Sequence, residues 1–459
     1  MGTSSGTSSR SGTSRNGTKH VERSGARVWL WPAVAGAVAL AAALVLAQLR
    51  PRESSLLSRL AWPGGTDGAS TMLQAIAAAS ISVISMTFSL TVVALQLASQ
   101  QFSPRLLRDF MRDPWTKAVL AVLVSTFVFS LTVLRGMHPD QPPPAAALFV
   151  AFVLGIASVA AVLGFIHHLT RLLRVDTMML TVHDEALAAI DAFYPSLDGP
   201  ARRTPDELDA DWAAATGIPA TRSGFVRLVD VEDLVGAARE HDAVVWIDVR
   251  PGDHVVAGSP LASACAPGLD ERGREELAER VRGTVALGYE RTIEQDSAFG
   301  FRQLTDIAVK ALSPGINDPV TAAHCIGHAA DLLVRLTGKQ LGPTVHEDED
   351  GTGRAVVPDR DLRYYLDLVC GQVRRYGERE PTVLAALLRM LRDVATAART
   401  QEHRDEVERQ VRLILAEVPE SMVDADVEQV HDLAERVRTA SAGDVRAAYR
   451  DRAGETRSI

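Results

Sequence analysis

The chain contains 459 residues, of which 47% are hydrophobic and 23% are charged, and its formal net charge is −9. This length exceeds what one hydrophobic core usually serves, so we expect a membrane part and at least one separately folded part. A mean hydropathy of +0.05 is too polar for a protein embedded in lipid from end to end. The acidic average excludes nucleic acid as a general partner, because phosphate binding needs a clustered basic face.

The first 27 residues are mostly Ser, Thr and Gly with scattered basic residues, a composition that predicts a disordered basic tail. The run 28–49 that follows has no charged residue. At 1.5 Å per residue it reaches about 33 Å, enough for a bilayer core of about 30 Å. A cleaved signal peptide is the alternative, but the run is long for one and no small-residue cleavage site follows it.

Three further apolar runs, 71–97, 117–134 and 145–166, complete four predicted spans, so 28–172 is the expected transmembrane domain. Basic residues gather in the N-terminal tail, after the second span and after the fourth, whereas the loop after the third span holds only Arg135. By the positive-inside rule both termini face the cytoplasm, although the first outer loop also carries three arginines.

The segment between the second and third spans has the pattern of a short amphipathic helix. Ser103 and Pro104 begin it, and its apolar residues recur on one face. Arg105, Arg108 and Arg112 lie largely off that face, which predicts a helix in the headgroup layer that contacts anionic lipid. Packing of the same helix on the protein's own cytoplasmic part is the alternative.

The second span is polar on two sides. At 100° per residue, one face carries Ser82, Ser85, Ser89 and Gln96, and the opposite face carries Ser80, Thr87 and Thr91. Small hydroxyl residues favour close helix packing, which is one interpretation of both faces. The other is that the stripe of Ser82, Ser85, Ser89 and Gln96 lines a hydrated path at an oligomer axis.

No Asp, Glu, Lys or Arg lies in the core of any predicted span. Ion-coupled transporters usually need an intramembrane ionisable group or broken helices, so their absence argues against secondary active transport. A passive pore remains compatible, because hydroxyls, backbone and dewetting can select and gate without buried charge.

The rest of the chain predicts an α+β cytoplasmic region. We expect a helical connector over 173–223, a small β-barrel or sandwich over 224–266, a helical bundle over 267–440 and a tail over 441–459. The turn around Pro251, Gly252 and Asp253 looks like one half of a lipoyl-type barrel. No lysine occurs between Lys117 and Lys310, so covalent lipoylation or biotinylation there is excluded.

The turn 312–319 is the most informative part of the expected bundle. Pro314 and Gly315 end one helix, and Asn317 or Asp318 caps the next, with a proline in its first turn. We interpret Asp296 in the same structural way, as a helix cap that orients Arg291 or Arg302.

An enzyme site is the less favoured interpretation of this region. It would combine the acidic residues and the histidines of one segment: Glu294, Asp296, Asp306, Asp318, His324 and His328. His324 and His328 lie one helical turn apart, as metal ligands can, but no metalloprotease, phosphate-loop, esterase or dinucleotide motif occurs. The cysteines are three in number and widely spaced, which indicates neither a disulfide framework nor a zinc site: Cys265, Cys325 and Cys370. We therefore expect no enzyme activity, metal or cofactor.

Several motifs together resemble one bacterial family. They are FSLT at 88–91, LQLASQQFSPR at 95–105, Gln295-Asp296 and LSPGINDP at 312–319. The chain from 28 to about 437 is similar to the predicted membrane proteins of domain of unknown function 2254. The resemblance implies a membrane location and the same layout, and it brings no catalytic residues or substrate. We expect the membrane to be the bacterial plasma membrane.

Two functions follow as hypotheses. The first is a homo-oligomeric channel or pore with the second span at its axis and a cytoplasmic part that assembles or gates it. The alternative is a membrane-anchored sensor or scaffold whose bundle binds a cytoplasmic partner. In either case the lipid bilayer is a partner.

Overall fold

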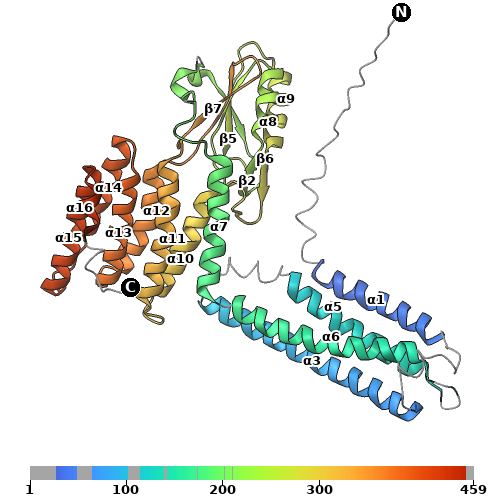
Figure 1. Ribbon diagram of the computed structural model, residues 1–459. Coiled ribbons are helices and arrows are strands. Elements are labelled where there is room, and N and C mark those ends of the chain that lie inside the picture. The colour runs from blue at the N-terminus through green and yellow to red at the C-terminus, as the bar shows by residue number, and fades with distance from the viewer. Residues whose placement is uncertain are drawn as a thin grey trace, which may run out of the picture. The chain divides into compact units, whose positions relative to one another are not determined.

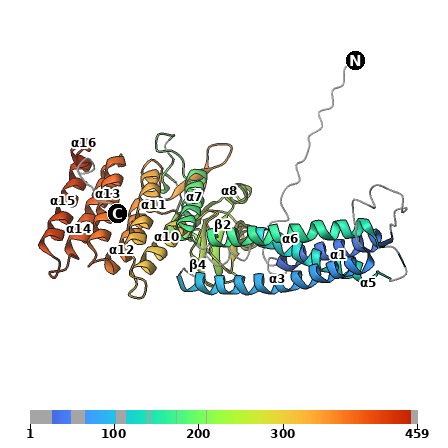
Figure 2. The same ribbon diagram turned by 60° about the horizontal axis from the view of Figure 1, so that its bottom comes forward.

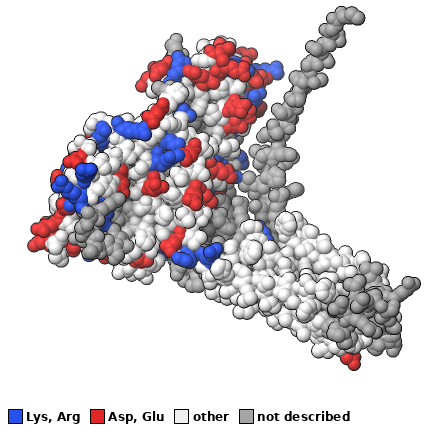
Figure 3. Space-filling model, in the orientation of Figure 1, with Lys and Arg blue, Asp and Glu red and all other residues white. Residues whose placement is uncertain are grey.

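The computed structural model describes residues 27–48, 65–101, 114–138, 141, 143–172, 174–200, 202–208 and 210–450 (Figures 1 and 2). The chain divides into an N-terminal unit, Met1–Arg174, and a C-terminal unit, Val175–Ile459. In Figure 3 the described surface of the N-terminal unit is nearly free of charged side chains, whereas Lys, Arg, Asp and Glu are spread over the C-terminal unit.

The N-terminal unit consists, in its described part, of four long helices: α1 (Arg27–Gln48), α3 (Thr66–Gln101), α5 (Pro114–Arg135) and α6 (Ala145–Leu172). All four are long and apolar enough to cross a membrane, as predicted. Helix α5 packs against each of the other three. At 36 residues α3 is about 54 Å long, so it exceeds the bilayer core of about 30 Å.

Buried hydroxyl groups help to hold these helices together. The Thr126 and Ser158 hydroxyl oxygens, from α5 and α6, lie 2.8 Å apart, and both side chains are buried. A small residue allows close approach nearby: a Cβ on Gly164 would lie 3.2 Å from the Trp115 ring. These contacts fit the rule that membrane helices associate through small residues and interhelical hydrogen bonds rather than through the hydrophobic effect.

The C-terminal unit contains two sheets. The five-stranded sheet has the order β1-β5-β3-β8-β7, with β1 (Thr216–Pro219), β5 (Pro260–Cys265), β3 (Val244–Ile247), β8 (Gly353–Val357) and β7 (Thr344–Glu347). The three-stranded sheet has the order β4-β2-β6, with β4 (His254–Val255), β2 (Gly224–Val229) and β6 (Val285–Gly288).

A closed barrel was the wrong expectation for this region. In the described part of the chain both sheets are open, and strands from far along the sequence extend them. The β7–β8 hairpin joins the larger sheet where β8 pairs in parallel with β3. Helices α8 (Val231–Glu240) and α9 (Glu271–Thr284) complete a core that includes Leu234, Val245, Leu261 and Val281. The apolar faces are therefore covered by helices rather than by closure of the sheet.

The remaining helices form a layered bundle (Figure 1). They are α7 (Val175–Phe193), α10 (Ser297–Ala311), α11 (Pro319–Thr337), α12 (Leu362–Tyr376), α13 (Pro381–Ala397), α14 (Gln401–Ala416), α15 (Asp424–Ser441) and the short α16 (Val445–Ala448). Short 3-10 turns lie at Pro205–Glu207 and Trp212–Ala214. Capping residues begin several helices: the side chains of Asp318, Asp361 and Thr400 each accept a hydrogen bond from a backbone N–H in the first turn.

Candidate functional site

The two polar faces of α3 have different surroundings in the N-terminal unit. Ser80 and Thr87 are buried against the neighbouring helices, and Thr91 is half-buried. The other face, formed by Ser82, Ser85, Ser89 and Gln96, is exposed throughout. One face of α3 therefore packs inside the unit, and the face predicted to line a pore points out of it.

The exposed face continues toward the start of α3. Thr71, Gln74, Ala75 and Ala78 are also exposed and lie on the same side of the helix. Gln74 and Gln96 are separated by about 33 Å along the axis, close to the thickness of a bilayer core. Two of the hydroxyls between them bond to their own helix: Ser82 Oγ donates to the Ala78 carbonyl (2.9 Å) and Ser89 Oγ to the Ser85 carbonyl (3.0 Å). We call this stripe the α3 polar face.

The predicted lipid-facing arginines, Arg105, Arg108 and Arg112, lie outside the described residues. Their contact with anionic lipid stays a prediction.

Asp296 lies in a buried cluster of charges where the sheets meet the bundle. Its carboxylate is only 1% exposed and forms ion pairs with Arg291 and with Arg360, whose Nη1 is 3.3 Å from Oδ1. Asp296 precedes α10, but its side chain makes no capping hydrogen bond, because both oxygens are held by the two arginines. Arg360 also donates to the Pro251 carbonyl (2.7 Å) and so ties the loop after β3 to the bundle.

A second buried network adjoins this cluster. The Tyr194 hydroxyl donates to Asp359 Oδ1 (3.0 Å) and lies 2.8 Å from the Tyr365 hydroxyl, which in turn lies 2.8 Å from Ser297 Oγ. Burial raises the pKa of Asp359. Because every one of these groups is engaged with another, the arrangement serves to join helices α7, α10 and α12.

The turn between α10 and α11 is held in one shape by its own backbone. Asn317 has a φ of 51°, in the left-handed region, and the Asp318 N–H donates to the Ala311 carbonyl at 2.8 Å. Asp318 caps α11: its carboxylate accepts from the Thr321 N–H (3.0 Å) and hydroxyl (2.6 Å). The hydrogen bond from the Thr321 hydroxyl is the main reason that the pKa of Asp318 is lowered.

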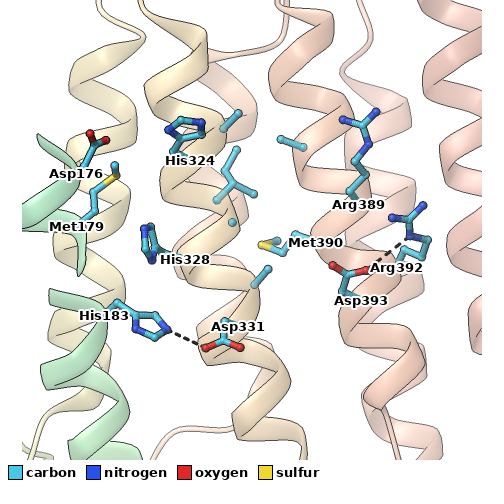
Figure 4. Close-up of a pocket in the computed structure, with 15 residues that line it drawn as sticks. Asp176, Met179, His183, His324, His328, Asp331, Arg389, Met390, Arg392 and Asp393 are labelled. Atoms are coloured by element: carbon cyan, nitrogen blue, oxygen red, sulfur yellow. Dashed lines mark hydrogen bonds and ion pairs between the residues drawn. The ribbon is translucent and has the colours of Figure 1, made fainter. Parts of the chain in front are cut away.

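A histidine-lined groove of about 720 Å³ lies between α7, α11 and α13 (Figure 4). It contains His324 and His328, which the sequence singled out, and a third histidine, His183, which it did not. His183 Nε2 lies 2.8 Å from Asp331 Oδ2, and the His183 and His328 rings are 5.4 Å apart. Only folding brings His183 to this place, because it lies far earlier in the chain.

The groove has both apolar and charged lining, and the charged Arg392 is as buried as the apolar residues. Met179, Ile326 and Met390 line it together with small residues, while Arg389 and Asp393 reach it from α13 (Figure 4). Its volume lies within the range of small-molecule sites. Among the described residues no group of three or more His, Cys, Asp and Glu side chains is placed to hold a metal ion.

The other candidates for an enzyme site are not brought to the groove. Glu294 forms an ion pair with Arg227 at 3.2 Å, and Asp306 forms one with Arg302 at 2.9 Å. Asp296 is sealed in the buried cluster described above. The acidic residues and the histidines of that segment therefore do not form one site.

The lowered pKa of His328 predicts that the stability of the protein depends on pH. Burial, with smaller contributions from His183 and His324, lowers its pKa in the folded protein. The folded state thus favours neutral imidazole, so this contribution is present above the unfolded pKa of about 6.5 and is lost as pH falls through the lower folded value. Thermal unfolding of the full chain in detergent should occur at a lower temperature at acidic pH, and His328→Gln should reduce that difference. An unchanged difference in this variant would contradict the assignment to His328.

Residues 25–393 match a family model that is described as predicted membrane protein, domain of unknown function 2254. The chain is also similar to uncharacterized proteins of Mycobacterium bovis and Mycobacterium tuberculosis. Each is 35% identical over 398 residues, which cover 84% of this chain and 75% of the relative. No solved structure matches the chain. The resemblance seen in the motifs is thereby confirmed, and the chain belongs to the predicted membrane protein family of domain of unknown function 2254.

Proposed function

We propose that the protein forms a homo-oligomeric passive pore in a bacterial plasma membrane, with the α3 polar face of each copy at the axis. The observation that carries this proposal is the exposure of Ser82, Ser85, Ser89 and Gln96 on one side of a helix that is apolar enough to cross a membrane. Within the described part of the N-terminal unit no helix covers this face, and we assign a second copy of the chain to it.

The residue types along the face suit such an assembly. Alanine and serine allow helices of neighbouring copies to approach closely, and hydroxyls offer hydrogen bonds to a partner or to water. Ser82 and Ser89 already bond to their own backbone, so each can present its remaining hydrogen-bonding capacity to water without an unsatisfied donor. Rows of hydroxyls are sufficient to line a weakly selective passage.

The charge distribution supports an orientation with both termini in the cytoplasm. The C-terminal unit then lies on the side where a cytoplasmic ligand or protein has access to it. The histidine-lined groove gives a specific reason to keep the second candidate function, a membrane-anchored sensor or scaffold, beside the pore.

Ion flux through the purified protein in liposomes tests the pore. The variant Ser85→Leu/Ser89→Leu should lose most of the flux while the oligomer mass in lipid nanodiscs is unchanged, because two large apolar side chains would narrow and dry the passage. The matched control is Met86→Leu/Phe88→Leu, which places two leucines at exposed positions of the same helix outside the α3 polar face. This control should conduct as the unsubstituted protein does.

Two results would refute the pore. If Ser85→Leu/Ser89→Leu breaks the oligomer apart, the face is a packing surface. If the unsubstituted protein conducts no ion over a range of salts and pH, the sensor or scaffold becomes the better proposal, and ligands for the groove become the next object of search.

A further inference from the structure

The α3 polar face leads, at the start of the helix, to an acidic residue. Asp67 lies in the first turn of α3, and steps of four, three and four residues connect it to Thr71, Gln74 and Ala78. Residues at these steps lie on one side of a helix, so Asp67 continues the α3 polar face, and it is exposed as they are. At 1.5 Å per residue it precedes Gln74 by about 10 Å along the axis. Asp67 therefore lies at one end of this face, just outside the stretch that matches a bilayer core.

The carboxylate of Asp67 is distinctive in its surroundings. Asp67 is the only acidic residue in the described part of the N-terminal unit. The hydroxyls of Ser70 and Thr71 both donate to its backbone carbonyl, at 2.9 Å, rather than to its carboxylate. The side chain thus extends an uncharged polar stripe with a full negative charge at its end.

A local reason also favours an acidic residue near this position. A helix N-terminus carries about half a positive charge, which an acidic side chain in the first turn offsets. Position 66 or 68 would serve this purpose as well, although each lies about 100° around the helix from Asp67. The helix dipole therefore explains the residue type but not the side of the helix. Because the dipole cancels only about half of the carboxylate charge, this end of the α3 polar face stays negative.

We infer that Asp67 makes the pore selective for small cations, an inference that rests on the pore proposed above. Rotational symmetry of a homo-oligomer with the α3 polar face at its axis would bring the Asp67 side chains of all copies into one ring. A ring of carboxylates raises the local concentration of cations and lowers that of anions. The hydroxyls and amides farther along the face carry no charge, so ions are selected at this mouth.

The position of the ring suits this role. At the mouth the carboxylates remain in water, and they avoid the cost of placing a charge in the bilayer core. In the proposed orientation, with both termini in the cytoplasm, the mouth with Asp67 opens on the other side of the membrane. Selection by a ring of this kind should weaken with salt, because the screening length falls from about 10 Å at 0.1 M to about 3 Å at 1 M.

Reversal potentials of the full chain in planar bilayers, under a gradient of KCl, measure the permeability ratio of potassium over chloride. The unsubstituted protein should favour potassium at about 0.1 M salt and lose most of this preference at about 1 M. Asp67→Asn should lower the ratio about tenfold toward 1 at the lower salt concentration. Asp67→Glu should keep the preference, and Asp67→Lys should reverse it toward chloride. The oligomer mass in lipid nanodiscs should be the same for all of these variants.

Arg135→Gln is the matched control. Arg135 is exposed at the end of α5, and this end packs on the side of α3 opposite Asp67, where Ala69 and Leu73 share a core with Val133. Loss of its charge lies far from the proposed axis, so the ratio should change by less than about twofold at 0.1 M salt.

The outcomes separate this inference from the pore itself. A chloride preference in the unsubstituted protein, or an unchanged ratio in Asp67→Asn while the flux persists, would overturn the inference and leave the pore standing. Effects of equal size in Asp67→Asn and Arg135→Gln would also overturn it, because the charge of the whole surface, rather than a ring at the axis, would then set the ratio. If the unsubstituted protein conducts no ions, the pore is refuted, and the inference with it.

Discussion

Replacing Asp296 with asparagine is expected to lower the free energy of unfolding of the C-terminal unit by about 3–5 kcal/mol, the usual result of removing one partner from a buried ion pair. The carboxylate is 1% exposed, and Arg360 beside it is 3% exposed. Asparagine keeps the volume but removes the negative charge, so both Arg291 and Arg360 lose a charged partner. The arginine guanidinium does not lose its proton in a protein, so the unfavourable burial of an unpaired charge remains.

Chemical denaturation of the full chain in detergent measures this loss, with fluorescence of the Trp212–Trp246 pair in the C-terminal unit as the signal. Asp306→Asn is the matched control, because it makes the same change on α10 in an ion pair with Arg302 that is partly open to solvent. That control should cost less than about 1 kcal/mol. Equal losses for the two variants would show that the buried cluster contributes no more than a surface pair.

Gly252→Ala should lower the free energy of unfolding of the C-terminal unit for two reasons. The backbone conformation at this position disfavours alanine, and the added Cβ collides with neighbouring side chains. Gly252 has a φ of 90°, and an added Cβ would fall well inside the contact distance of Asp296 Oδ2 and Arg291 Nε. The left-handed backbone alone costs an alanine about 1–2 kcal/mol. The collision adds to this because the carboxylate is held by two arginines and has no room to move, so the total should reach about 3 kcal/mol or more.

Gly258→Ala separates the two contributions. Gly258 has nearly the same φ, 89°, but no atom lies within 4 Å of the added Cβ. Its alanine variant should therefore show the backbone cost alone in the same denaturation experiment. If Gly252→Ala is no more destabilising than Gly258→Ala, the loop after β3 does not pack tightly against Asp296.

The sequence by itself determined the local features of this protein. Four apolar runs predicted the four helices that can cross a membrane, because a span depends only on the length and polarity of one continuous segment. The helix start at Asp318 and Pro319 was also readable, since a cap and the helix it begins are neighbours in the chain. The two faces of α3 followed from helical periodicity alone.

Only the tertiary structure decided which distant segments meet. Strand β8 pairs with β3 although about a hundred residues separate them. This pairing makes β8 and β7 part of an open five-stranded sheet, where a small barrel or sandwich of nearby strands was expected. His183 contacts His328 and Asp331, and Asp296 contacts Arg360. The hydrophobic periodicity of the segments that hold these residues does not indicate these contacts. Packing likewise decides which face of α3 is buried. Local patterns encode the shape of an element, but the choice of its neighbours depends on the complementarity of whole surfaces, which no single stretch of sequence contains.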